Sequence, residues 1–344
     1  VNSTQQLAEA LTGMGETLTE RTRSGAVKVD RPVLLALADL DTDWRRVGAR
    51  EPNPLATAVL RSKRAHKWRQ TYAETLLETV DEGGRVHPHI NALQARTGRM
   101  SATRPPLQTL PSSDAVIRRA LLADEGHVMI SADFQAIELR VLAALADVRR
   151  MKEAIRGGED LHGLTARLVF GAGYTPDQRD LCKSIGFGKV YGGGPEGIAR
   201  LSGAPVEAVR RAVDAYDRVY PEIGRASKRW QREAIAAGLV YVSPTGRRLP
   251  LDRNKVYAVT NYLCQSVARD VLGQALIRMD EAGLMAHLRL PVHDEVLASA
   301  PADVAQELGR AIEHAMTFDV FGVPMQATAK IGGRSWGSLY GADF

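Results

Sequence analysis

The clearest pattern along the chain runs from His127 to Val148, HVMISADFQAIELRVLAALADV. Its apolar start, Val128 to Ile130, predicts a buried strand that ends near Asp133. Apolar residues then recur at helical spacing, which predicts a helix directly after the strand; they are Ile137, Val141, Ala144 and Leu145. A carboxylate at the end of a buried strand is costly unless a cation meets it. A lone aspartate there would more often cap the helix, so both interpretations of Asp133 stay open at this point.

A second apolar strand, Leu288 to Val292, leads into His293-Asp294-Glu295-Val296. This strand therefore places another aspartate at its end. Two strand-borne aspartates could hold two divalent metal ions side by side, which is the arrangement used for in-line phosphoryl displacement. The second aspartate favours a metal site over a simple helix cap at Asp133.

A further helix is predicted to begin at Pro176 and to end at the run of glycines from Gly192 to Gly194. Thr175 is a good N-cap, and Gln178 completes a T-x-x-Q capping box. Residues four apart then form one stripe of two cations and two aromatic rings: Arg179, Lys183, Phe187 and Tyr191. Such a stripe is a poor core face and suits a nucleoside triphosphate, with the cations near the phosphates. The alternative is an amphipathic helix with incidental cations.

These segments resemble the three motifs of the A-family DNA polymerases, the bacterial DNA polymerase I type. DFQAIELRVLAAL is similar to motif A, RDLCKSIGFGKVYGGG to motif B and VHDEV to motif C, and the resemblance covers nearly the whole chain. It implies a C-terminal polymerase domain of bacterial or phage origin, with a mixed α+β, right-hand architecture. The expected parts are a helical thumb without its first portion (1–85), the first part of an antiparallel-sheet palm (86–150), helical fingers (151–249) and the second part of the palm (250–344).

The resemblance also implies the reaction and the residues that carry it. It implies template-directed addition of deoxynucleotides to a primer 3′-hydroxyl, with two Mg²⁺ ions, which Mn²⁺ can replace, held by Asp133, Asp294 and the Phe134 carbonyl. Lys183 is the candidate general acid, and Glu295 is a third carboxylate with a secondary role. The nucleotide site is expected to contain Gln135, Glu138, His162, Arg179, Lys183, Phe187 and Tyr191. Glu138 is expected to lie under the sugar and to exclude a 2′-hydroxyl, which predicts DNA rather than RNA synthesis.

Contacts with primer–template DNA are expected from two further groups of side chains. In the two parts of the palm the resemblance points to Arg99, Gln108, Asn261, Gln265 and His293, which would face the minor groove near the primer terminus. In the thumb, the cations Arg61, Lys63, Arg64 and Lys67 are interleaved with Trp68 and Tyr72. A charge run of this kind is usually a solvated helix face, but beside the polymerase motifs it indicates phosphate contacts.

Some positions depart from the family pattern. Gln135-Ala136 replaces the usual Ser-Gln, and Gly186 replaces a common Asn. Neither change affects a metal ligand, but Gln135 and Ala136 would lie near the primer and template, so fidelity could differ from the family norm.

Composition adds only weak constraints. The 344 residues carry a net charge of +5, which suits a polyanionic partner without proving one. The two cysteines form no CxxC, so neither a zinc site nor a disulfide framework is expected. No apolar run approaches the length of a membrane span, and we expect a cytoplasmic monomer, in the bacterial cell or a phage-infected host, without a proofreading exonuclease in this chain. The remaining alternatives are a catalytically inactive DNA-binding fragment that needs a missing N-terminal segment or a processivity factor, and a single-subunit RNA polymerase.

Overall fold

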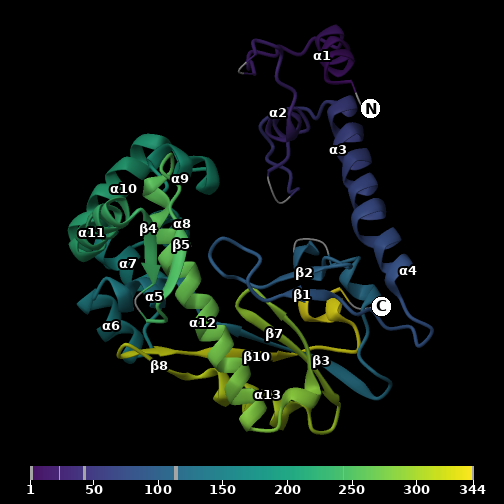
Figure 1. Ribbon diagram of the computed structural model, residues 1–344. Coiled ribbons are helices and arrows are strands. Elements are labelled where there is room, and N and C mark those ends of the chain that lie inside the picture. Colours follow the sequence, from purple (N-terminus) through teal and green to yellow (C-terminus); the bar gives the residue numbers. More distant parts are fainter. Residues whose placement is uncertain (1–2, 23, 42–43, 112–114, 243, 343–344) are drawn as a thin grey trace. The chain divides into compact units, whose positions relative to one another are not determined.

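The computed structural model describes residues 3–22, 24–41, 44–111, 115–242 and 244–342 (Figure 1). Helices and strands are mixed, as the sequence predicted, and the chain divides into two compact units. The first unit contains residues 1–89 and 104–117, and the second contains residues 90–103 and 118–344. The second unit holds all three motif segments, so it is the unit that matters most for function.

The first unit is helical. It contains α1 (Thr4–Gly13), α2 (Arg31–Leu37) and α3 (Pro54–Lys67), which continues through a π-helical segment, Trp68–Glu74, into α4 (Thr75–Thr79). Side-chain N-caps start the first three helices, and a small apolar cluster that includes Leu11, Leu34 and Val59 packs them together. This burial gives the unit a core of its own.

The largest sheet of the second unit has four antiparallel strands. Its strand order is β10 (Ala327–Ile331), β3 (His127–Phe134), β7 (Glu295–Pro301) and β6 (Leu288–Val292). Helix α13 (Ala305–Met316) packs against β10 and β3, and α12 (Val259–Glu281) packs against α13 (Figure 1). Helix α13 packs on β3, and Met129, Ile130, Ala132 and Phe134 of this strand are buried.

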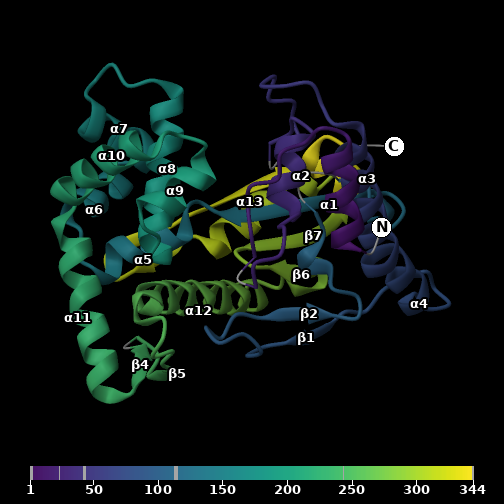
Figure 2. The ribbon, with the colours of Figure 1, turned by 90° about the horizontal axis from the view of Figure 1, so that it is seen from above.

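The helices between the two halves of the sheet lie together on one side of the second unit (Figure 2). They are α5 (Ile137–Leu145), α6 (Arg149–Arg156), α7 (Leu161–Phe170), α8 (Pro176–Tyr191), α9 (Pro195–Ser202), α10 (Val206–Val219) and α11 (Pro221–Ala237). Four short strands form two hairpins, β4 (Leu239–Val242) with β5 (Arg247–Pro250) and β8 (Phe318–Val320) with β9 (Val323–Met325). Another small sheet joins β1 (His89–Asn91) to β2 (Ser101–Thr103).

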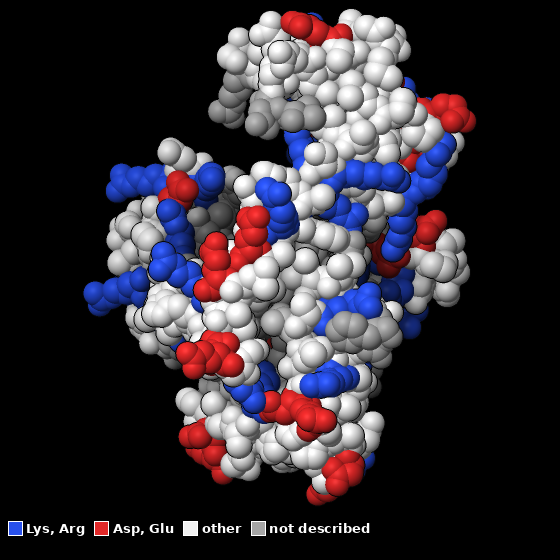
Figure 3. Space-filling view, turned by 90° about the vertical axis from the view of Figure 1, so that its right-hand side faces the viewer, with Lys and Arg blue, Asp and Glu red and all other residues white. Residues whose placement is uncertain are grey.

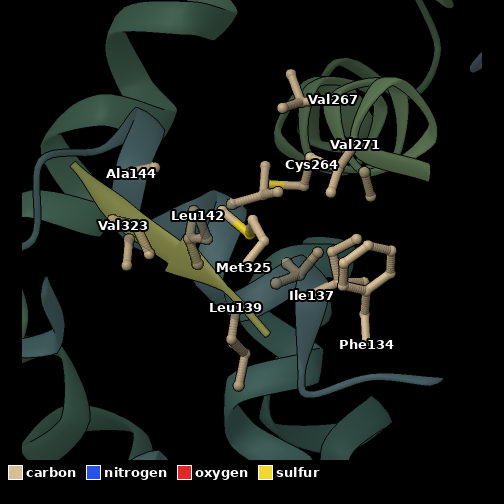
Figure 4. Packing of buried hydrophobic residues seen from close by; sticks show 14 of the residues in the cluster. Phe134, Ile137, Leu139, Leu142, Ala144, Cys264, Val267, Val271, Val323 and Met325 are labelled. Atoms are coloured by element: carbon tan, nitrogen blue, oxygen red, sulfur yellow. The ribbon is translucent and has the colours of Figure 1, made fainter. Parts of the chain in front are cut away.

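Helix α5 lies at the centre of the main core. Its side chains Ile137 and Leu142 point toward Cys264 and Val271 of α12 and toward Met325 of β9 (Figure 4). All eight residues from Ile137 to Ala144 are buried, including two charged ones. Because protein surrounds α5, it gives the segment after Asp133 a rigid support.

Most of the elements predicted from the sequence are present. The strand before Asp133, the helix from Ile137, and the capping box of Thr175 and Gln178 are confirmed. The last two strands of the chain follow closely on each other, since β9 ends at Met325 and β10 begins at Ala327. Both cysteines are free and buried, and among the described residues no helix is long and apolar enough to cross a membrane.

Candidate active site

A cavity of about 520 Å³ in the second unit brings together side chains from all three motif segments. It lies where β3, α5, α7, α8 and the turn between β6 and β7 meet. The residues that line it are Arg99, Asp133, Phe134, Ala136, Ile137, Glu138, His162, Arg179, Lys183, Phe187, Tyr191, His293 and Asp294. The two predicted metal-binding aspartates and the whole cation–aromatic stripe of α8 therefore share one cavity.

Pairing of the strands places the carboxylates side by side. In the register of β3 and β7, Asp133 is directly opposite Glu295, and Asp294 precedes Glu295 in the turn. The Phe134 backbone N–H donates to the Asp294 carbonyl at 3.1 Å, which ties the two strand ends together. The Phe134 ring is buried edge-on against Phe318 and anchors the end of β3. Both aspartates consequently belong to one rigid corner of the sheet.

The electrostatics of this corner are dominated by negative charge. Desolvation, followed by the charges of Asp294 and Glu295, raises the pKa of Asp133 to about 7. Desolvation also raises the pKa of Asp294 and of Glu295. The Asp133 residue itself is solvent-exposed toward the cavity, although Ala132 and Phe134 on either side are buried. The sequence therefore predicted the end of the strand correctly, but the Asp133 carboxylate faces the cavity and does not lie in the core.

A divalent cation fits this donor set. Mg²⁺ uses few protein carboxylates and keeps several waters, so Asp133, Asp294 and the Phe134 carbonyl could serve as its protein ligands. Three neighbouring carboxyl groups with raised pKa values also show that their charges are poorly compensated by the protein alone. Among the described residues, no group of three or more His, Cys, Asp or Glu forms a preformed metal cage.

The turn that follows Asp133 is strained and is held by a buried arginine. Ala136 has a left-handed backbone with a φ of 47°, which is unfavourable for a residue with a Cβ. The Arg140 guanidinium donates to the Gln135 carbonyl at 2.7 Å and to the Pro324 carbonyl at 2.5 Å. It also donates to the Gln326 side chain at 3.1 Å. Sequence reasoning gave Arg140 no role, although an arginine inside a predicted apolar helix was the available signal.

Helix α8 directs its stripe into the cavity because its opposite face is apolar. Leu181, Cys182 and Ile185 are buried in the core. On the cavity side the rings of Phe187 and His162 lie 6.2 Å apart. Desolvation lowers the pKa of His162, so this side chain is neutral at pH 7 and available as a hydrogen-bond donor without a charge.

Glu138 is the centre of a polar chain at the base of the cavity. Its carboxylate is buried and accepts from Arg99 Nη2 at 2.6 Å and from the Tyr191 hydroxyl at 3.3 Å. Gln265 Nε2 in turn donates to the Tyr191 hydroxyl at 3.2 Å. The sequence assigned Glu138 and Tyr191 to the nucleotide and Arg99 and Gln265 to DNA. The structure joins these four side chains in one network.

Two predicted site residues are turned away from the cavity toward neighbouring strands. Gln135 donates from its side-chain amide to the Thr328 hydroxyl at 2.7 Å. Glu295 accepts from the Ser131 hydroxyl at 2.5 Å, two residues before Asp133 on the same strand. Sequence reasoning missed Ser131, and only the cross-strand register could have indicated it.

The remaining predicted DNA-binding residues differ in how deeply they are buried. Asn261 is buried on α12, and its side-chain N–H₂ has no hydrogen-bond partner among the described residues. Gln108 is buried and belongs to the first unit. On α3, Arg61, Lys63 and Lys67 are exposed, while the Arg64 guanidinium is flanked by the rings of Trp44 and Trp68 at 4.5 and 4.4 Å. Figure 3 shows cationic and anionic side chains interspersed on the face it presents, so the net positive charge does not form one continuous patch there.

Comparisons with known proteins give several sequence matches. A family model described as DNA polymerase family A matches residues 1–338. The DNA polymerase of Mycobacterium phage D29 is 44% identical over 346 residues, covering 100% of this chain and 56% of the relative. DNA polymerase I of Synechocystis is 30% identical, covering 77% of this chain and 30% of the relative. The chain thus spans about half the length of the phage relatives that it matches.

One solved structure gives a spatial comparison. It is the POL domain of Pol1 from M. smegmatis in complex with DNA primer-template and dNTP, which is 27% identical in sequence. The match has a TM-score of 0.80 and covers 98% of this chain and 61% of that one.

Proposed function

The chain belongs to DNA polymerase family A, and we propose that it adds deoxynucleotides to a primer 3′-hydroxyl under the direction of a DNA template. The observation that carries the proposal is the shared cavity, in which Asp133 and Asp294 face the Arg179–Lys183 side of α8. Carboxylates for metal ions on one side and cations for phosphates on the other are what nucleotidyl transfer requires. The similar Pol1 structure, which contains primer-template and dNTP, supports the same substrates.

The reaction is attack of the primer 3′-hydroxyl on the α-phosphorus of the triphosphate, with release of pyrophosphate. Asp133, Asp294 and the Phe134 carbonyl would hold two Mg²⁺ ions, which would supply the charge that activates the hydroxyl and stabilises the leaving group. Arg179 and Lys183 bind the phosphates, and their charge acts where negative charge develops on the pyrophosphate. Lys183 is exposed at the cavity and is the candidate proton donor to that leaving group.

Glu138 is proposed to select the sugar. Arg99 and Tyr191 hold its carboxylate from two sides, so it cannot swing away to admit a 2′-hydroxyl at low cost. A fixed side chain rejects the larger sugar by steric exclusion. The protein should therefore use deoxynucleotides in strong preference to ribonucleotides. Comparable extension with both would contradict the proposal.

DNA is proposed to contact both units of the chain. Arg99, Gln265, Asn261 and His293 would meet the minor groove near the primer terminus, where donors can test the shape of any base pair. The side-chain N–H₂ of Asn261 is buried and has no hydrogen-bond partner among the described residues, so a contact with DNA would require this side chain to turn outward. In the first unit, Gln108 would act in the same way, and the exposed cations of α3 would bind phosphates. Affinity should fall as salt rises because phosphate contacts release counterions.

The competing function is DNA binding without catalysis. Intact carboxylates and an intact cation stripe argue against it, since binding alone does not need the costly charge cluster around Asp133. The test is Mg²⁺-dependent primer extension with Asp294→Ala as the inactive control. We also propose that this chain carries no proofreading site, so a mismatched primer end should persist in its presence.

A further inference from the structure

One carboxylate connects the two helices that form the nucleotide side of the cavity. Asp160 is the N-cap of α7 and accepts from the backbone N–H groups of His162 at 3.1 Å and Gly163 at 3.0 Å. The same carboxylate accepts from Arg179 Nε, in the first turn of α8, at 2.7 Å. A single side chain thus fixes the beginning of α7 to the beginning of α8.

The Asp160 carboxylate lies close over the start of α7, although 48% of its side chain is exposed. A Cβ on Gly163 would lie 2.8 Å from the Asp160 Oδ2 atom and 2.9 Å from the Tyr174 hydroxyl. Both distances are too short for a real contact, so only glycine allows the carboxylate to lie this close over the start of α7. Its two backbone hydrogen bonds direct the Asp160 carboxylate toward Arg179.

The ion pair uses one edge of the Arg179 guanidinium. Asp160 meets Nε, while Asp180 Oδ1 lies 3.8 Å from Nη1, which is too long for a good hydrogen bond. A guanidinium has five N–H donors in a rigid fork, so it can bind a carboxylate at Nε and a phosphate at its other nitrogens. Arg179 lines the cavity with His162 and Lys183, where a triphosphate is proposed to bind.

We propose that Asp160 is a positioning residue for the nucleotide: it holds the Arg179 guanidinium in the orientation that receives the triphosphate. An unrestrained arginine loses considerable side-chain entropy when it binds a phosphate. Because Asp160 already restricts the Arg179 side chain in the folded protein, part of this entropy is lost before the substrate binds. The inference rests on the proposed role of Arg179 at the triphosphate, and it adds a function for an acidic residue next to a polyanionic ligand.

The informative variant is Asp160→Asn in the full chain. Asparagine is an N-cap as good as aspartate, so the start of α7 is preserved, but it has no charge with which to hold Arg179. We expect the KM for each deoxynucleotide to rise by roughly three- to fivefold, the scale of a solvent-exposed ion pair, with the change falling on KM rather than kcat. The Kd of the nucleotide for a complex with a dideoxy-terminated primer should rise equally, and the unfolding midpoint should stay within the error of the parent.

Asp180→Asn is the matched control, because it removes a carboxylate that is near Arg179 but too distant to orient it. The KM of this variant should stay the same or fall slightly. A fall in KM for Asp160→Asn would show that Asp160 competes with the triphosphate, and the inference would be overturned.

A double-mutant cycle distinguishes failure of the positioning role of Asp160 from failure of the proposed triphosphate site at Arg179. If Asp160 acts through Arg179, then Asp160→Asn should have no further effect on KM in an Arg179→Ala background. An equal effect in both backgrounds would refute the positioning role. If Arg179→Ala alone leaves the nucleotide KM unchanged, the proposed triphosphate site fails instead.

Discussion

Removing the Asp133 charge should stabilise the protein at high pH in the absence of divalent metal. The pKa of Asp133 in the folded state is about 7, compared with an ordinary value of 3.8. Between these two pH values the folded state holds a proton that the unfolded state has lost. Stability from this group is therefore complete below about pH 4, and it decreases as the pH rises to about 7. Asp133→Asn abolishes that loss.

The magnitude follows from the exposure of the side chain. For a fully buried carboxylate, a rise from 3.8 to about 7 would be equivalent to roughly 4 kcal/mol. Because Asp133 is solvent-exposed on its cavity side, screening by water reduces this cost, and we expect about 1 kcal/mol at pH 8. The free energy of unfolding of Asp133→Asn should therefore exceed that of the parent by about 1 kcal/mol at pH 8, and the two should converge near pH 4.

The assay is urea unfolding with a metal chelator present, at several pH values between 4 and 8. Asp214→Asn is the control, since Asp214 is exposed on α10, far along the chain from the carboxylate cluster. Adding Mg²⁺ should stabilise the parent and narrow its difference from Asp133→Asn, because a ligand that binds only the folded state raises its stability. An Asp133→Asn variant that is no more stable than the parent at pH 8 would refute the reasoning. A difference that does not change between pH 5 and pH 8 would refute it equally.

Three further substitutions test the site. Ala136→Gly should raise the free energy of unfolding by about 0.5–1 kcal/mol because it relieves the left-handed backbone. The control is Ala146→Gly, at a φ of −86°, which should lower the free energy of unfolding. A change of the same sign in both variants would contradict the strain argument. Glu138→Ala should increase ribonucleotide incorporation at least about tenfold relative to deoxynucleotides, and an unchanged ratio in competitive primer extension would exclude Glu138 as the sugar filter. Phe187→Tyr should increase termination by dideoxynucleotides, and unchanged termination patterns would count against placing Phe187 in the nucleotide site.

Local signals predicted the elements of the site well. The capping box of Thr175 and Gln178, and the apolar run before Asp133, depend on neighbours within a few residues, so they could be read directly from the sequence. The shared motifs then placed Asp133, Asp294 and Lys183 in a single site, and the structure brings them to one cavity.

The supporting contacts could not be predicted, because each depends on tertiary pairing. Arg140 reaches the Pro324 carbonyl 184 residues away, and Ser131 reaches Glu295 164 residues away. The ion pair of Arg99 with Glu138 also requires the folded chain, although the two residues are only 39 positions apart. Sequence spacing carries no information about which polar side chains meet across a sheet, since the register is set by the whole core.

Primer extension on a primed DNA template tests the central claim most directly. The reaction should contain Mg²⁺, compare deoxynucleotides with ribonucleotides, and include Asp294→Ala beside the parent. We predict template-directed extension with deoxynucleotides only, which the substitution abolishes. A parent protein that binds primed DNA but extends it with neither substrate would contradict the account, and the cavity around Asp133 would then serve binding without catalysis.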